Sequence, residues 1–362
     1  MSIQSGLASW LRLTLTPGLG SSRLRDLLRR FGLPDQVLSA QRSQVAAIVG
    51  EHIAAAMEAE TLRAAVDGAL HWAGAPENHI ITLADETYPR LLLETADPPA
   101  LLYCSGKLDY LHNPALAIVG SRNATAQGAR DAEAFAGSLG RAGFTIVSGL
   151  ALGIDSAAHL GALDTECSTI AVLGAGVNVV YPAANAPLYK LIRQRGLLVS
   201  EFPLGSPPIA RNFPRRNRVI SGLSLGCLVI EAAPASGSLV TARTAAEQGR
   251  EVFALPGSIH APLSKGCHIL IKSGAKLVES AEDVLVELGG HQGYLPRPLS
   301  NKAVTHPPTE PLLNQMGHAP IDIDSLSLRS GLPAERVSTE LLRLELAGQV
   351  ASLPGGLYQR LS

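Results

Sequence analysis

The sequence has few aromatic residues and few cysteines. Phenylalanine, tryptophan and tyrosine make up 4% of its 362 residues, which argues against the base-stacking surface by which OB-fold proteins hold single strands. The four cysteines (Cys104, Cys167, Cys227 and Cys267) are far apart and form no Cys-x-x-Cys motif. This spacing fits a reducing compartment and argues against a structural zinc site. We expect no metal and no cofactor.

Long apolar runs and an excess of one charge are also missing. No apolar run reaches the ~18 residues of a membrane-spanning helix, and the N-terminus lacks a basic stretch followed by an apolar one. We therefore expect a cytoplasmic protein. The formal net charge is −1, so contact with a polyanion would have to come from local clusters of charge.

The length and the 46% apolar content predict two or three domains. Residues 1–74 read as helical, 75–289 as an α/β core, 290–307 as a proline-rich linker and 308–362 as a small separate unit. Within the core, short apolar runs alternate with helical segments, which is typical of a parallel sheet covered on both faces. The strands are expected at 116–119, 144–147, 169–173, 197–200, 227–230 and 251–255.

The two end segments each leave an alternative open. Near the N-terminus, two helices joined by Thr16-Pro-Gly-Leu-Gly20 resemble a helix–hairpin–helix, whose amides can bind phosphate. An ordinary helix–helix turn is slightly favoured. At the C-terminus, two helices and two strands around Pro354-Gly-Gly356 predict a winged helix. Its long helix, 332–346, is acidic or neutral overall, which favours contact with protein over DNA.

The strongest charged signal is the run Arg211-Asn-Phe-Pro-Arg-Arg-Asn-Arg218, with four arginines in eight residues. It follows one predicted strand, and Ser236-Gly-Ser-Leu-Val-Thr241 follows the next. Glycine, hydroxyl groups and arginines at helix starts beside neighbouring parallel strands indicate a phosphate site. We expect this site to hold the backbone of single-stranded DNA. Arg216→Glu is expected to abolish most of the binding and to leave the fold intact.

Other strand ends carry weaker signals. Gly120-Ser-Arg122 either offers a guanidinium fork to phosphate or is a plain turn. Ser148-Gly149 begins a loop of small residues, after which Asp155 is expected to cap a helix and His159 to be structural. The run 174–179 begins Gly-x-Gly but has valine in place of the third glycine, so a dinucleotide site is weakly supported. Glu201 and Glu231 at strand ends leave a hydrolytic role open.

With these motifs the chain resembles the bacterial DNA-processing proteins of the DprA (Smf) family. The matching stretches include 88–92, 97–103, 120–122, 148–155, 213–218, 236–242 and 248–257. The resemblance implies an extended Rossmann-like core that forms a homodimer, binds single-stranded DNA and loads RecA onto it in natural transformation. It also implies a SAM-like N-terminal domain, a C-terminal winged helix and no enzymatic activity.

The residues expected to bind DNA combine these motifs. Many family members carry a basic residue after Tyr181-Pro182, where this sequence has Pro187, and Lys190, one turn later, is expected to substitute for it. The expected residues are Gly120, Ser121, Arg122, Ser148, Gly149, Lys190, Arg211, Arg215, Arg216, Asn217, Arg218, Ser236, Gly237, Ser238 and Thr241.

The alternative function is an enzyme of the lysine-decarboxylase-like phosphoribohydrolase type, which cleaves nucleoside monophosphates. Those enzymes carry Pro-Gly-Gly-x-Gly-Thr followed by a glutamate. Here the corresponding stretch, 235–241, lacks that pattern, and Ala245 and Ala246 precede Glu247. The carboxylate needed for acid–base work is therefore not in its expected place.

Overall fold

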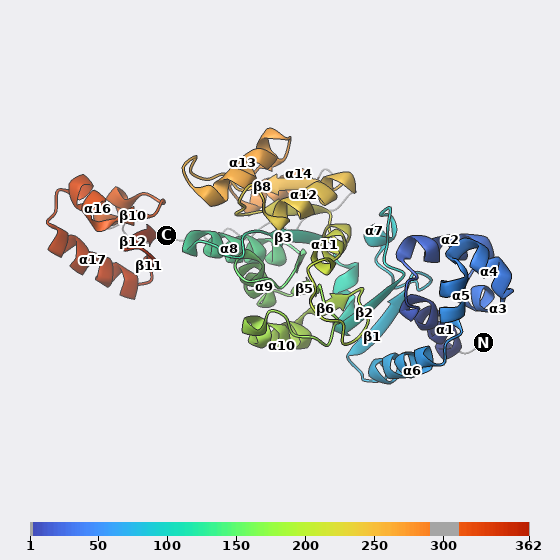
Figure 1. Ribbon diagram of the computed structural model, residues 1–362. Coiled ribbons are helices and arrows are strands. Elements are labelled where there is room, and N and C mark those ends of the chain that lie inside the picture. Colours follow the sequence, from blue (N-terminus) through green and yellow to red (C-terminus); the bar gives the residue numbers. More distant parts are fainter. Residues whose placement is uncertain (1–2, 290–310, 362) are drawn as a thin grey trace.

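The computed structural model describes residues 3–289 and 311–361 (Figure 1). Its centre is a nine-stranded sheet in the order β1-β2-β6-β5-β4-β3-β7-β8-β9. In this spatial order, all strands from β6 through β3 to β9 are parallel. At one edge, β2 is antiparallel to β6 and β1 is antiparallel to β2. The strands are β1 Asn78–Thr82, β2 Leu101–Gly106, β3 Ala115–Val119, β4 Thr145–Ser148, β5 Thr169–Val172, β6 Leu197–Ser200, β7 Gly226–Val229, β8 Glu251–Ala254 and β9 Lys276–Leu277.

The six predicted strands of the core correspond to β3–β8, so the parallel sheet is confirmed. Every residue of β3 is buried because helices cover both faces of the sheet. One face packs against α7 (Arg90–Leu93), α11 (Asn212–Gly222), α12 (Gly237–Glu247) and α13 (Lys265–Lys272). The other packs against α8 (Ala126–Arg141), α9 (Ile154–Leu163), α10 (Ala186–Arg195) and α14 (Ala281–Gly289). Three short 3₁₀ helices are Leu108–His112, Ala183–Asn185 and Pro262–Ser264.

The N-terminal segment is helical, as predicted, and packs on the antiparallel edge of the sheet. Trp10 and Ala69 share an apolar cluster with Tyr103 of β2, and the ring of Trp72 meets that tyrosine edge-on at 6.0 Å. The N-terminal helices thus pack on the core, and they also have an apolar cluster of their own that includes Leu13, Leu27 and Val45. The helices are α1 Ile3–Leu15, α2 Ser21–Phe31, α3 Pro34–Ser39, α4 Arg42–Val49, α5 Glu51–Met57 and α6 Thr61–Ala73.

The C-terminal unit has the predicted winged-helix architecture and its own apolar core, which includes Leu326, Leu341 and Val350. Its three-stranded sheet has the order β10-β12-β11. The predicted linker 290–307 lies outside the described residues. Within the described ranges, no helix is long and apolar enough to cross a membrane. The elements are α15 Pro311–Met316, β10 Ile321–Asp322, α16 Ile323–Ser330, α17 Ala334–Leu346, β11 Val350–Leu353 and β12 Leu357–Arg360.

Candidate functional site

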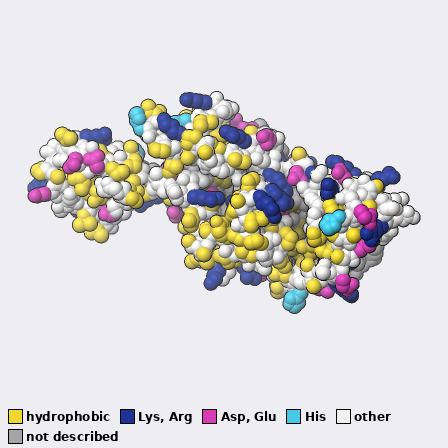
Figure 2. Space-filling model, viewed as in Figure 1, with side chains coloured by type: hydrophobic (Ala, Val, Ile, Leu, Met, Phe, Trp, Pro, Cys, Tyr) yellow, Lys and Arg dark blue, Asp and Glu magenta, His cyan; other side chains and the backbone are white. Residues whose placement is uncertain are grey.

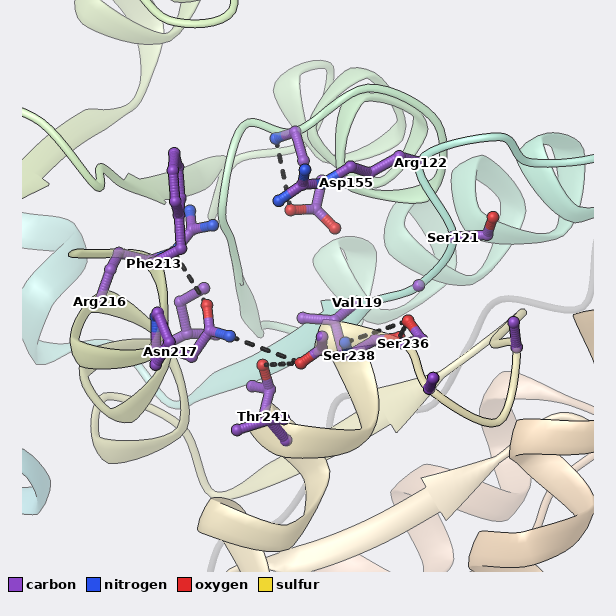
Figure 3. Close-up of a pocket in the computed structure, with 18 of the residues that line it drawn as sticks. Val119, Ser121, Arg122, Asp155, Phe213, Arg216, Asn217, Ser236, Ser238 and Thr241 are labelled. Atoms are coloured by element: carbon purple, nitrogen blue, oxygen red, sulfur yellow. Dashed lines mark hydrogen bonds between the residues drawn. The ribbon is translucent and has the colours of Figure 1, made fainter. Parts of the chain in front are cut away.

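A cleft of about 500 Å³ lies at the carboxyl ends of β3 and β7 (Figure 3). These neighbouring strands lead to helices on opposite faces of the sheet, because β3 continues into α8 and β7 into α12. Such a switch point leaves a crevice where open α/β sheets bind ligands. Nine of the predicted DNA-binding residues line it: Gly120, Ser121, Arg122, Arg216, Asn217, Ser236, Gly237, Ser238 and Thr241.

One wall of the cleft is the turn after β3, which presents Arg122. This arginine is exposed, and its guanidinium carbon lies 5.7 Å from the centre of the Phe213 ring. The Ile154 amide, at the start of α9, donates to the Ser121 carbonyl oxygen at 3.1 Å and fixes this turn. Arg122 therefore offers an unburied cation beside an aromatic face.

Arg216 lies at the floor of the cleft and is only 5% exposed. Its Nη1 donates to the Gly149 carbonyl oxygen and, at 2.7 Å, to that of Val172. Burial lowers the pKa of Arg216 to about 10, while the nearby Asp155 opposes this shift. The guanidinium is therefore charged at neutral pH. Gly149 is required here, since an added Cβ would lie 2.1 Å from Arg216 Nη1.

Asp155 differs from its predicted role as a helix cap. The N-cap of α9 is Gly153, and Asp155 Oδ2 instead accepts hydrogen bonds from the amides of Gly149 (3.1 Å) and Ala151 (3.4 Å). Burial raises the pKa of Asp155, and Arg216 lowers it in part. The Gly149 amide, expected to face a ligand, is therefore already bound within the protein.

His159 is structural, as predicted. Its Nε2 accepts from the Leu150 amide at 3.2 Å, so Nδ1 carries the proton and donates to Thr169 Oγ1 at 2.7 Å. Burial lowers the pKa of His159 to about 3, and the ring is neutral at physiological pH. It fixes the loop after β4 against β5.

The opposite wall is the N-terminus of α12, where Figure 3 places Ser236, Ser238 and Thr241 across the cleft from Arg122. Ser236 is the N-cap and accepts from the Ser238 amide at 3.2 Å. A Cβ on Gly237 would meet nothing within 4 Å, so the backbone of the first turn is accessible. Amide groups at a helix start favour an anion. The Ser236 and Ser238 hydroxyls share one hydrogen bond at 2.5 Å and leave one hydroxyl proton to donate, while the Thr241 hydroxyl donates to the Gly237 carbonyl oxygen at 3.4 Å.

Six predicted residues do not line this cleft, and one of them, Gly149, lines the smaller cavity beside it. Ser148 is buried and donates to the Ile118 carbonyl oxygen at 2.6 Å. Lys190 on α10 and Arg211 at the start of α11 are exposed but line neither this cleft nor the cavity beside it. Arg215 lies over the Phe202 ring at 5.2 Å. Figure 2 shows Lys and Arg side chains gathered around α11, but they do not all serve one site.

Arg218, the last of these six residues, pairs with two carboxylates. Its Nη2 lies 2.5 Å from Glu201 Oε2 and its Nε 3.6 Å from Asp97 Oδ2. Asp97 also pairs with Arg25 of α2, and the Tyr88 hydroxyl donates to the Pro99 carbonyl oxygen at 2.7 Å. The stretches 88–92 and 97–103 therefore anchor α11 to the N-terminal helices and do not contact the cleft.

A smaller apolar cavity of about 110 Å³ adjoins the cleft and shares Arg122, Arg216 and Phe213 with it. A Cβ on Gly174 would lie 2.8 Å from the Phe213 ring. The Gly-x-Gly run after β5 thus makes room for an aromatic side chain. Phe213 was missed as a site residue, although a ring within an arginine cluster is a signal for nucleic-acid contact.

The two glutamates at strand ends, Glu201 and Glu231, already have partners within the protein. Glu201 pairs with Arg218 and Arg215, and Glu231 accepts from the Thr125 hydroxyl at 2.6 Å. Among the described residues no group of three or more His, Cys, Asp and Glu could hold a metal ion. The arrangement is suited to binding an anion through cations, amides and hydroxyls.

Comparison with known proteins agrees with this geometry. The family described as DNA recombination-mediator protein A matches residues 79–289, and the DprA winged helix domain matches 296–356. Protein Smf of Escherichia coli K12 is 48% identical over 306 residues, covering 83% of this chain and 82% of that protein.

Two solved structures are also similar. DNA processing protein A (DprA) from Streptococcus pneumoniae has a TM-score of 0.68 at 40% identity, covering 79% of this chain and 99% of that one. DNA processing protein A from Helicobacter pylori, described with a single-stranded DNA binding mode, has a TM-score of 0.52 at 31% identity, covering 58% and 95%. The chain belongs to the DprA (Smf) family of DNA-processing proteins.

Proposed function

We propose that the cleft binds the phosphate backbone of single-stranded DNA and that no bond is broken there. The observation that carries this proposal is the convergence of Arg122, Arg216 and the first turn of α12 on one cleft. Guanidinium groups and helix-start amides are the groups that hold phosphate most effectively. The single-stranded DNA binding described for the H. pylori relative supports this choice of ligand.

The size of the cleft favours a single strand over a duplex. A volume of about 500 Å³ admits a short length of flexible strand, whereas a duplex keeps its phosphates on a rigid cylinder. Phe213 and Tyr181, whose rings lie 5.7 Å apart, supply aromatic surface at the adjoining cavity, and base–aromatic contact is available only to unpaired bases.

The proposal extends to a homodimer that presents two bound strands and loads RecA onto them during transformation. Exposed apolar side chains near the β9 edge, Ile259, Ile269 and Leu277, support a contact between two cores. Light scattering should give twice the chain mass of 37.8 kDa, and Leu277→Glu should lower it. RecA filament growth on strands covered by a single-strand-binding protein should start sooner when the protein is added.

Titration of labelled single-stranded and duplex oligonucleotides at two salt concentrations tests the central proposal. Single strands should bind more tightly, and the affinity should fall with salt at a log–log slope of about −0.7 per phosphate neutralised. Equal affinity for the duplex, or no dependence on salt, would contradict the proposed cleft.

The phosphoribohydrolase alternative needs a carboxylate free to act as acid or base. The carboxylate that lines the cleft is Asp155, and its Oδ2 accepts from two backbone amides. We therefore propose binding without cleavage. Incubation with a panel of nucleoside monophosphates should release no free base, and release would restore the enzyme hypothesis.

A further inference from the structure

The outer face of α17 exposes leucines that the fold does not use. Val337, Leu341 and Leu344 of this helix pack in the core of the winged helix. Leu342 and Leu346, by contrast, are 57% and 83% exposed. Residues four apart lie one above the other on a helix, so these two leucines form one apolar stripe pointing away from the domain. Figure 2 shows hydrophobic side chains in the region of α17.

Two carboxylates flank the leucine stripe. Glu335 is seven positions before Leu342, and Glu345 is three positions after it. Both therefore lie on the same face of the helix as Leu342. Glu345 Oε1 accepts from the Ser352 hydroxyl at 2.6 Å, which fixes its position beside the wing. Arg343, three positions before Leu346, borders the other side of the stripe. Its charge is offset there because it pairs with Glu340 at 2.8 Å.

This face is unsuited to DNA. In helix-turn-helix folds the corresponding helix reads the major groove, where it needs cations against phosphate. Residues 308–362 contain four arginines, no lysine and six Asp or Glu, a formal charge of 4 − 6 = −2. Arg360 on the wing donates to the Leu313 carbonyl oxygen at 3.0 Å, so its charge is directed at the domain itself.

We propose that the α17 face, defined by Glu335, Leu342, Glu345 and Leu346, docks an amphipathic helix of a protein partner that carries Lys or Arg beside an apolar stripe. Leucines four residues apart are the usual anchors of helix-to-helix recognition, and the flanking carboxylates select the charge of the partner. A second copy of this face would bring like charges together, and an anionic lipid surface would be repelled for the same reason.

The probe is a synthetic 18-residue helical peptide with leucines at heptad spacing and lysines beside them, titrated against the full chain by fluorescence anisotropy. Leu342→Ser with Leu346→Ser should weaken binding at least tenfold, and Glu335→Gln a few-fold. Val286→Ser, which alters a 69% exposed apolar side chain on α14, is the matched control and should bind as the unaltered chain does.

Three results would overturn the proposal. If a peptide with glutamates in place of the lysines bound as tightly as the basic peptide, the carboxylates of α17 would not select the charge of the partner. If the variant with both Leu342→Ser and Leu346→Ser bound the peptide as tightly as the unaltered chain, the peptide would not bind at the leucine stripe. Hydrogen-exchange protection of α17 by duplex DNA, with none by the basic peptide, would assign the face to nucleic acid. Protection of α17 amides by the basic peptide supports the proposal.

Discussion

Replacing Arg122 by alanine separates binding from folding more cleanly than replacing Arg216. Arg122 is exposed and makes its described contact with a ring, whereas Arg216 is buried against two carbonyl oxygens. The contacts of Arg216 lead us to revise the expectation that Arg216→Glu leaves the fold intact. The substitution would bury a carboxylate against those oxygens and Asp155, and we predict that it destabilises the fold. Arg122→Ala should leave the unfolding transition unchanged.

The expected loss of affinity follows from one charge-assisted contact. Hydrogen bonds to charged groups contribute about 1.5–3 kcal/mol, which corresponds to about 10- to 150-fold in affinity for DNA. Losing one phosphate contact should also reduce the log–log salt slope by about 0.7. The ratio of wild-type to variant affinity should therefore be about 2.6-fold larger at 50 mM than at 200 mM salt.

The assay is fluorescence anisotropy of a labelled single-stranded oligonucleotide over that range of salt. Arg63→Ala, which removes an arginine that is 75% exposed on α6, is the matched control and should retain both the affinity and the slope. If Arg122→Ala retained both as well, the guanidinium would not contact phosphate, and the proposed cleft would lose its exposed cation.

Three further predictions concern stability. Arg218→Ala leaves Glu201 buried with one weaker partner and should cost about 3–5 kcal/mol in urea unfolding, whereas Arg90→Ala at an exposed pair should cost under about 0.5; equal costs would contradict the network. Gly149→Ala should cost about 1–3 kcal/mol through its clash with Arg216, with Gly237→Ala as the control in open space. Because the pKa of His159 falls to about 3 on folding, its share of the stability is present above the unfolded value of about 6.5 and is lost as pH falls. Between pH 7 and 5 the loss is about 2 kcal/mol, and His159→Gln should remove that part of the pH dependence.

The sequence was sufficient for the strands of the parallel sheet but not for their order. The strands at 197–200 and 227–230, expected to be neighbours, are β6 and β7, and β5, β4 and β3 lie between them. Short apolar runs bounded by glycine and polar turns marked β3–β8, because strands covered on both faces need no alternation. The parallel order then brought Gly120-Ser-Arg122 and the 236–241 turn to one edge. Sequence could not show that β3 and β7 are neighbours, since that pairing joins residues more than a hundred positions apart.

The arginine cluster was predicted less well because its residues occupy different faces of α11. The residues of α11 that line the cleft include Phe213, Arg216, Asn217 and Ile220. Their i, i+3, i+4, i+7 spacing places them on one face of the helix. Arg215 and Arg218, three apart, point to Glu201 on another side. Helical spacing from residue 212 onward would have separated the two sets.

The position of Arg216 has a consequence for the kinetics of any ligand seated over it. Its rotamer is set by Gly149 and Val172 before a ligand arrives, so the roughly 2 kcal/mol of rotamer entropy that a long cationic side chain carries is already spent in folding. Such preorganisation lengthens the residence time of a bound strand. The exposed guanidinium of Arg122 at the rim must instead be ordered at each encounter.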